Sequence, residues 1–511
     1  MSLRILHRTA VIAATALSAI MITAPGPAAA QRPAADPARA LQAYVTGALA
    51  NWGLPGTAVA VVRNDSIVFA RGFGVRELGK PEPVTANSVF AIGSTTKAFT
   101  ATALGMLADS GAIAWDDKVT RHLPAFQLFD PYVTRELTVR DLLTHRSGLT
   151  RGDRLWAGSQ FGRAEVLQRV RFLEPTWSFR SSYGYQNIMF LAAGTVVEQV
   201  GGTSWDEFVR ERILSPLGMR STVTSVSQLA ALSDVASPHE RIDGAYRPVP
   251  WLNIDNIGPA GSLNSSVNDM AQWLRLQLGG GSVGGHRLVS AKSMKETHTP
   301  QMITRMSDED EQMWPMSHLT AYGLGWSIRD YYGEKMVAHG GAIRGMRAQV
   351  TLVPESKLGV VVLVNGPQSS FPTAIANKAV DLYLGHPSRD WSALMLAAAR
   401  AQETKAADAR QKLEAARVAG TSPSLALAKY AGEYADSMYG PVQVRHEGTG
   451  LVITFGPNQT GDLAHWHFDT FEVVWRDKAF GRGFVSFLLD ARGAVSGLEL
   501  QNVAKFGRAT P

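Results

Sequence analysis

Two groups of β-forming residues, separated by a long helical stretch, set the strongest limit on how this chain folds. The first group is TAVAVVRNDSIVFARGFG, in which Asn64 and Asp65 are typical residues of a tight hairpin turn. The stretch from Ser94 to Gln272 has mostly helical spacing. Strand-like runs return at residues 322–330, 334–341, 347–354 and 358–366. Because both groups need partners for their apolar faces, this order predicts an α+β fold: an antiparallel sheet flanked by helices, with a mostly helical region inserted.

The composition changes after residue 390 and predicts a second, smaller domain. A helix expected near residues 371–384 completes a first domain that spans residues 31–390. Residues 391–426 are rich in Ala, Lys, Glu and Arg, which is typical of a helical linker. Short strands with turn residues between them then predict a small all-β, barrel-like domain over residues 427–511.

The first 30 residues have the pattern of a signal peptide. Arg4 and Arg8 accompany the start of an apolar run, and small residues lead to a predicted cleavage site after Ala30. The apolar run is shorter than the roughly 20 residues that a membrane helix needs, and no later segment reaches that length. We therefore expect a periplasmic or secreted protein without a membrane span.

Charge and cysteine content exclude several classes of function. The formal net charge is +6 and no tract of Lys or Arg occurs, which argues against a nucleic-acid partner. The chain has no cysteine, so disulfides, thiolate metal sites and a cysteine nucleophile are excluded. His465 and His467 have the spacing of one strand face, but two histidines do not complete a metal site. We expect no metal and no cofactor, and the sequence does not indicate an oligomeric state.

The segment AIGSTTKAFTATALGML carries Ser94 and Lys97 one helical turn apart in an otherwise apolar stretch. Gly93 precedes the serine, so Ser94 is expected at a helix N-terminus, where backbone N–H groups favour developing negative charge. A buried lysine with a lowered pKa accepts the serine proton and turns the hydroxyl into a nucleophile. The alternative is a helix cap beside a lysine whose charged end reaches solvent, since a Ser-x-x-Lys string also arises by chance.

Two further motifs carry side chains suited to the same chemistry. Tyr185 and Asn187 stand just before an apolar helical run, and a tyrosine relays a proton when a nearby cation lowers its pKa. Tyr183 competes for that role, and packing is the more usual fate of a tyrosine. His339 precedes two glycines on an expected strand, which lets a substrate lie along the strand edge. A lone histidine is more often a hydrogen-bonded structural residue.

Together these motifs make residues 35–385 resemble the serine β-lactamase and penicillin-binding superfamily, in particular class C β-lactamases and their esterase and peptidase relatives. That family carries Ser-x-x-Lys, Tyr-x-Asn, and a Lys or His followed by one residue and Gly. The matching segments here are Ser94–Lys97, Tyr185–Asn187 and His339–Gly341, in the same order. LTVRDLLTHRSGL, GPAGSLNSSVNDMAQWL and YGLGW are also similar to family segments. His145, in the first of these, is expected to be structural.

The resemblance implies a role for each motif residue. Ser94 would be the acylated nucleophile, activated by Lys97 together with Tyr185. Asn187 would orient Lys97 and contact the substrate amide. His339 would hold the tyrosine network or a substrate carboxylate.

The same resemblance implies that substrate binds along the strand at Gly341 and Ala342. The backbone N–H groups of Ser94 and Ala342 would form the oxyanion hole. His339 stands where penicillin-recognising enzymes usually carry Lys, and Gln186 stands where Ser is commoner. Both departures are familiar among esterases and D-peptide hydrolases, so they argue against antibiotic hydrolysis.

The leading prediction is a secreted serine hydrolase that cleaves ester or peptide-like amide bonds through an acyl-enzyme on Ser94. Its substrate would be a small ester, a peptide or a cell-wall-derived compound. A D-alanyl carboxypeptidase or weak class C-type β-lactamase is the second enzyme hypothesis, and a catalytically silent muropeptide-binding sensor is the alternative from another class.

Two hypotheses concern substrate access. The acidic, Met-rich loop over residues 301–319 either overhangs the cleft with Met313 or Trp314 or is a solvated surface loop. A substrate-gating role is assigned to the C-terminal domain as a hypothesis.

Overall fold

The computed structural model describes residues 36–367, 369–457 and 459–509, and residues 37–511 form one compact unit. The signal peptide predicted for residues 1–30 lies outside the described residues.

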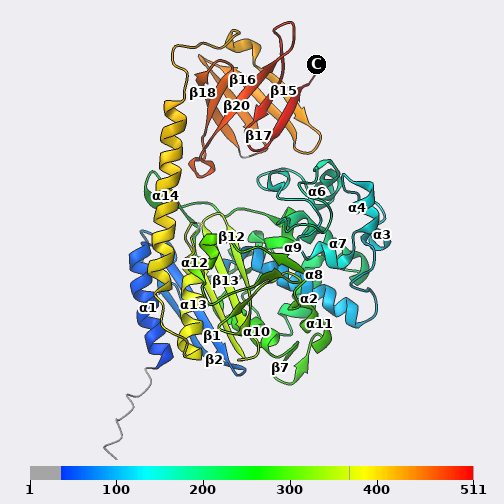
Figure 1. Ribbon diagram of the computed structural model, residues 1–511, viewed down its shortest axis with the longest axis vertical. Coiled ribbons are helices and arrows are strands. Elements are labelled where there is room, and N and C mark those ends of the chain that lie inside the picture. The colour runs from blue at the N-terminus through cyan, green and yellow to red at the C-terminus, as the bar shows by residue number, and fades with distance from the viewer. Residues whose placement is uncertain (1–35, 368, 458, 510–511) are drawn as a thin grey trace, which may run out of the picture. The chain divides into compact units, whose positions relative to one another are not determined.

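The main sheet joins strands from both ends of the first domain. Within the described residues its antiparallel order is β2-β1-β14-β13-β12-β11-β10-β9. Figure 1 labels β1, β2, β12 and β13 of this sheet. Asn64 and Asp65 have φ of 49° and 64° and close the β1–β2 hairpin, which confirms the predicted turn. The strands are β1 Gly56–Arg63, β2 Ser66–Gly74, β9 Met302–Thr304, β10 Thr320–Tyr322, β11 Ser327–Tyr331, β12 Glu334–Ile343, β13 Met346–Val353 and β14 Leu358–Val364.

One predicted strand is wrong: the run over residues 322–330 is split between β10 and β11. Gly323 donates its N–H to the carbonyl of Trp326, and Gly325 has φ of 79°, so a tight turn interrupts the run. A Cβ on Gly325 would lie 3.0 Å from the Lys97 carbonyl oxygen. The sequence pattern of this run looks like one continuous strand. Its glycines are needed for a turn that lies close to α2, and the spacing of apolar residues does not reveal such a requirement.

Helices cover both faces of the sheet, with α1 and α13 on one side and α2, α7 and α10 on the other (Figure 1). Buried side chains form two separate cores. Ala58 and Ala60 of β1 pack in the α2 core, whereas Val59 and Val61 pack in the α13 core. This alternation follows from the period of two in a strand. Together with the barrel described below, this architecture confirms the predicted fold class.

The described helices are α1 Pro37–Trp52, α2 Thr96–Asp109, α3 Val119–His122, α4 Pro131–Glu136, α5 Val139–Leu142, α6 Arg163–Arg169, α7 Asn187–Gly201, α8 Trp205–Val209, α9 Gly258–Gly261, α10 Val267–Leu278, α11 Ala291–Thr297, α12 Asp308–Met313, α13 Phe371–Leu384 and α14 Trp391–Ala415. Three small two-stranded sheets accompany them: β3 Phe90–Ala91 with β6 Asn264–Ser265, β4 His239–Ile242 with β5 Ala245–Pro248, and β7 Ser282–Val283 with β8 His286–Arg287.

The hypothesis that the 301–319 loop overhangs the cleft is wrong for its large side chains. Met313 and Trp314 pack against the α1/α13 core, where the Trp314 and Trp391 rings lie 6.1 Å apart. Arg329 stacks over the Trp314 ring at 4.2 Å. Burial of thioether and aromatic surface in that core is favourable, and it removes both side chains from the cleft.

The C-terminal part is a closed antiparallel barrel whose strands follow one another in chain order. Leu451, Phe471 and Phe506 lie among its interior residues. His465 and His467 flank a register shift in β18, and the His465 ring contacts the Phe468 carbonyl, so a shared flat face is not formed. The strands are β15 Gly432–Asp436, β16 Gly440–Glu447, β17 Gly450–Phe455, β18 Thr460–His467, β19 Thr470–Trp475, β20 Arg482–Leu489, β21 Val495–Leu500 and β22 Ala504–Arg508.

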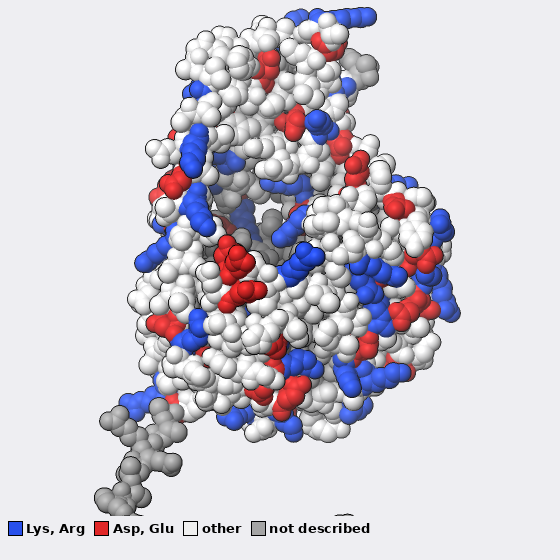
Figure 2. All heavy atoms as spheres, in the orientation of Figure 1, with Lys and Arg blue, Asp and Glu red and all other residues white. Residues whose placement is uncertain are grey.

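Figure 2 shows Lys and Arg interspersed with Asp and Glu over the visible face of the described residues. Across the described parts of the chain, no helix is both long enough and apolar enough to cross a bilayer.

Candidate active site

Ser94 lies in a short 3₁₀ turn, η1 Gly93–Thr95, that leads directly into α2. Gly93 has φ of 50°, and a Cβ at this position would lie 2.7 Å from the backbone N of Ala342. Only glycine therefore allows the Ser94 turn to approach β12 so closely. This approach brings Ser94 and Ala342, the two predicted oxyanion-hole residues, beside each other.

Lys97, one turn later on α2, is completely buried. Its Nζ lies 2.9 Å from Ser94 Oγ, 2.7 Å from Asn187 Oδ1 and 2.9 Å from the Ala260 carbonyl oxygen. Burial is the main reason that the pKa of Lys97 falls well below its ordinary value. The alternative of a solvated lysine is therefore wrong.

The three neighbours of Nζ are compatible with an uncharged amine, the form that burial favours. A neutral amine has two N–H donors and one lone pair, and the oxygens of Asn187 and Ala260 can only accept hydrogen bonds. The Ser94 hydroxyl is the one neighbour that also has a proton to donate. In this protonation state the lone pair of Lys97 faces the Ser94 proton, as a general base requires.

Tyr185 donates its hydroxyl proton to Ser94 Oγ at 2.7 Å, and its ring lies 4.3 Å from the His145 ring. Burial raises the pKa of Tyr185, so the side chain is a neutral phenol at neutral pH. The sequence argument assumed that a nearby cation would lower this pKa, but desolvation dominates. Tyr183 also packs against His145, and against Tyr322, but the hydrogen bond to Ser94 Oγ comes from Tyr185.

Asn187 is held by a residue that the sequence analysis missed. Its Nδ2 donates to Asp153 Oδ1 at 2.9 Å, which turns Oδ1 towards Lys97. Asp153 also accepts from Trp156 Nε1 at 3.1 Å and from Arg151 at 3.2 Å. No local pattern signals this contact, because 34 positions separate the two side chains.

The edge of β12 beyond Ala338 is open on one side. β11 pairs with β12 only as far as Ala338, while β13 pairs through Ile343. A Cβ on Gly341 would lie 1.9 Å from the Ile92 carbonyl oxygen, so glycine is required for this edge to meet the Ser94 turn. Backbone groups from Gly341 onward are therefore in position to bind an extended substrate.

His339 is buried, and both of its ring nitrogens form hydrogen bonds. Its Nδ1 lies 2.7 Å from the Gly340 carbonyl oxygen and therefore donates, so Nε2 accepts from the Tyr322 hydroxyl at 2.8 Å. Burial is the main reason that the pKa of His339 falls to about 3. The side chain is uncharged at neutral pH and supplies no cation for a substrate carboxylate. Tyr322, which belongs to the YGLGW segment, had no predicted role.

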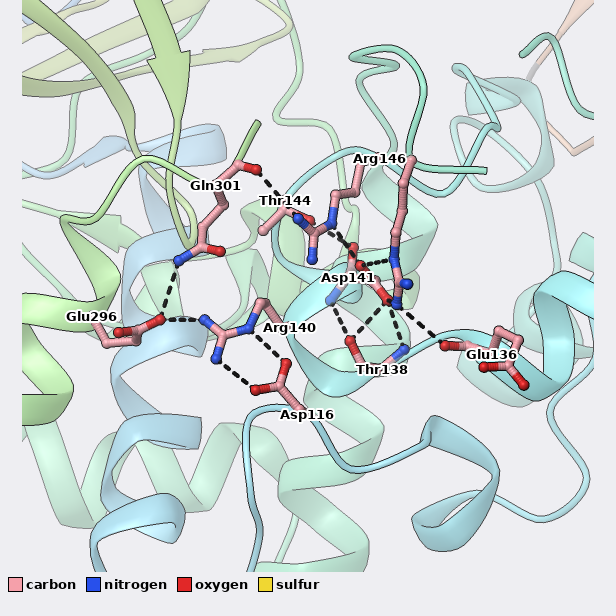
Figure 3. A network of polar contacts seen from close by, with 10 residues as sticks. Asp116, Glu136, Thr138, Arg140, Asp141, Thr144, Arg146, Glu296 and Gln301 are labelled. Atoms are coloured by element: carbon pink, nitrogen blue, oxygen red, sulfur yellow. Dashed lines mark hydrogen bonds and ion pairs between the residues drawn. The ribbon is translucent and has the colours of Figure 1, made fainter. Parts of the chain in front are cut away.

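His145 is a packing residue, as expected. It is completely buried, and its Nδ1 accepts the Gln186 N–H at 3.0 Å next to Tyr185. The segment that carries His145 is fixed by Asp141, whose carboxylate binds Arg146 and Thr138 in the network of Figure 3. This network supports the ring against which Tyr185 packs.

Comparison with known proteins identifies related families over both parts of the chain. The Beta-lactamase family model matches residues 41–384, and a domain of unknown function, DUF3471, matches residues 416–509. The Unguisins hydrolase ungD' of Aspergillus campestris is 30% identical over 410 residues, which are 76% of this chain and 73% of that protein. Penicillin-binding protein 4 of Amycolatopsis lactamdurans is 30% identical over 324 residues, 61% of this chain and 81% of that protein.

Solved structures share the fold. The octameric penicillin-binding protein homologue from Pyrococcus abyssi has a TM-score of 0.61 and 22% identity, covering 92% of this chain and 99% of its own. A D-stereospecific amidohydrolase from Streptomyces sp. has a TM-score of 0.54 and 24% identity, covering 69% of this chain and 99% of its own.

Proposed function

Because the chain belongs to the β-lactamase family of serine hydrolases, we propose that it cleaves ester or peptide-like amide bonds through an acyl-enzyme on Ser94. One observation carries this proposal: the Lys97 amine is fully buried, 2.9 Å from the serine oxygen, and its other two neighbours only accept hydrogen bonds. A binding module has no need for an uncompensated buried amine beside a hydroxyl.

Acylation begins as Ser94 Oγ attacks the substrate carbonyl carbon and its proton moves to Lys97 Nζ. The negative oxygen that forms is stabilised by the N–H groups of Ser94 and Ala342, each worth about 3 kcal/mol in the transition state. The proton then passes through the Tyr185 hydroxyl to the leaving oxygen or nitrogen, whose bond to the carbonyl carbon breaks. The acyl group remains on Ser94.

Deacylation uses the same groups in reverse. A water molecule gives a proton to the Lys97–Tyr185 pair while its oxygen attacks the acyl carbon. The ester bond to Ser94 Oγ breaks, Oγ recovers a proton, and a carboxylic acid leaves. Tyr185 enters each step as a neutral phenol, which fits the direction of its pKa shift.

The uncharged His339 favours substrates that present no free carboxylate to this strand. Esters and internal peptide-like amides meet that condition better than a carboxypeptidase substrate or a penicillin does. The relatives described as a hydrolase and as an amidohydrolase support cleavage of bonds in this class.

The test combines active-site labelling with a substrate panel. Wild-type protein and Ser94→Ala are treated with a fluorophosphonate and examined by mass spectrometry, then assayed with p-nitrophenyl esters, linear peptides, D-Ala-D-Ala peptides and nitrocefin. We expect one label on Ser94 and turnover of esters or amides, both lost in Ser94→Ala. An unlabelled wild type that binds muropeptides without cleaving them would instead support the sensor hypothesis.

We also propose export through the N-terminal signal segment, with cleavage after Ala30. The basic residues, apolar run and small-residue end of residues 1–30 support this. N-terminal sequencing of the protein recovered from periplasm or medium is expected to begin at Gln31, and a protein that keeps residue 1 in the cytoplasm would refute it.

A further inference from the structure

A cavity of about 610 Å³ lies between the hydrolase part and the barrel. Its lining includes Phe161, Trp251, Leu252, Arg344, Asp477 and Phe480. Aromatic and aliphatic side chains therefore line the cavity together with polar groups and one charged pair, a combination that occurs in small-molecule subsites.

Three walls of this cavity are continuous in the chain with groups at Ser94. Arg344 follows Ala342 by two residues, a distance of roughly 7 Å along an extended strand. The wall over residues 250–256 leads into α9, whose Ala260 carbonyl binds Lys97. The wall over residues 158–161 follows the turn that carries Asp153.

A hydrogen-bonded side chain ties two of these walls together. Asn256 Nδ2 donates to the carbonyl oxygens of Trp156 and Phe161, both at 3.0 Å. These hydrogen bonds hold the two walls together, and Arg344, two residues after Ala342 on the chain, brings the cavity near the predicted oxyanion hole.

The barrel supplies the remaining wall through η8, Lys478–Phe480, and the residue before it. Arg344 Nη2 lies 2.7 and 2.8 Å from the two carboxylate oxygens of Asp477, and the guanidinium lies 5.4 Å from the Phe480 ring centre. Nε of Arg344 is buried and has no hydrogen-bond partner among the described residues. Lys478 adds an ion pair to Asp243 at 2.6 Å.

We propose that this cavity is a substrate subsite for a bulky apolar, preferably aromatic, group near the scissile bond, and that the barrel thereby helps to set substrate preference. The inference rests on the proposed acyl-enzyme function. Phe161, Trp251 and Phe480 supply apolar walls for the group, and the Arg344–Asp477 ion pair also lines the cavity.

The test compares matched esters on wild type and Phe480→Ala. One pair varies the acyl group, p-nitrophenyl acetate against p-nitrophenyl phenylacetate, and the other varies the leaving alcohol, ethyl acetate against 2-phenylethyl acetate. We expect Phe480→Ala to lower kcat/KM for the aromatic member of one pair by about tenfold and to leave the small member of that pair unchanged. The affected pair identifies which part of the substrate occupies the cavity.

Phe468→Ala is the matched control, because Phe468 is an exposed phenylalanine of the same barrel and does not line this cavity. Trp251→Ala probes the opposite wall and gives the same readout if Phe480→Ala fails to fold. Unchanged ratios in both variants would overturn the subsite while ester turnover and the Ser94 label persist. A wild type without label or turnover would instead refute the proposed function, and the subsite with it.

Discussion

Lys97 and Asp141 are two completely buried ionisable groups of the hydrolase part, but their surroundings offset the free-energy cost of burying a charge in opposite ways. Asp141 receives charged partners: Arg146 at 2.6 Å and Arg180 at 2.6 Å. Lys97 receives only neutral oxygens, and no ion pair to it occurs among the described residues. A paired charge stabilises local structure, whereas an unpaired amine gives up its charge and becomes a base.

Their pKa values move for different reasons. Burial acts to raise the pKa of Asp141, but hydrogen bonds from Arg180 and Thr138 together with the Arg146 charge outweigh it, and the net pKa is lowered. Burial lowers the pKa of Lys97 with no comparable compensation. The shifts therefore favour the charged carboxylate of Asp141 and the neutral amine of Lys97, although both side chains are fully buried.

The largest expected effect is on activity in Lys97→Met. Removal of the base should lower kcat for ester hydrolysis by at least roughly 10³-fold. Thermal stability should stay equal or rise, because a buried amine is replaced by an apolar chain. Lys378→Met is the control. Lys378 is also buried and its Nζ lies 2.7 Å from Ser388 Oγ, but Lys378 belongs to α13, outside the candidate active site. Full activity in Lys97→Met, or equal loss in both variants, would contradict the comparison.

Asp141→Asn should have its main effect on stability. Loss of the carboxylate leaves Arg146 and Arg180 facing a neutral group, and we expect the free energy of unfolding to fall by about 3 kcal/mol. Asp116→Asn is the control, since Asp116 pairs with Arg140 but its side chain is 71% exposed, and should cost less than about 1 kcal/mol. Denaturant titration measures both, and equal losses would show that burial is not the deciding factor.

Tyr185→Phe tests the catalytic role of the groups around Lys97. Without the hydroxyl 2.7 Å from Ser94 Oγ, protonation of a poor leaving group should slow, and amide turnover should fall by roughly 10²-fold. A p-nitrophenyl ester should be affected less, because its leaving group departs without a proton. Tyr183→Phe should leave the turnover of both substrates unchanged. Equal losses on amide and ester would assign Tyr185 to a step other than leaving-group protonation.

The smallest expected effect is on the pH dependence of stability, which should differ between Asp141 and Lys97. Since the folded pKa of Asp141 is lowered, its contribution is present above the unfolded pKa of about 3.9 and is lost as pH falls through the folded value. The lowered pKa of Lys97 makes stability decline as pH falls from 10.5 towards its folded pKa. The free energy of unfolding, measured as a function of pH, should lose its dependence on acidic pH in Asp141→Asn. It should lose its dependence on alkaline pH in Lys97→Met. Unchanged slopes in either variant would refute that assignment.

The predictable part of the site was local in sequence. Ser94 in η1 and Lys97 in the first turn of α2 are three residues apart, and the hairpin at Asn64 needs only two residues with positive φ. The other members were not visible locally. Asp153 reaches Asn187 from another loop, and Tyr322 reaches His339 across two strands.

Sequence alone determined the order of strands and helices, the family motifs and the two-part organisation, because periodicity and composition act over a few residues. It also fixed the Ser94–Lys97 pair, whose spacing is set by the helix itself. Only the tertiary structure decided the charge states of Lys97, Tyr185 and His339, because desolvation depends on the groups that the whole chain packs around them. The barrel wall beside Arg344 was decided in the same way, since more than 130 residues separate it from Asp477.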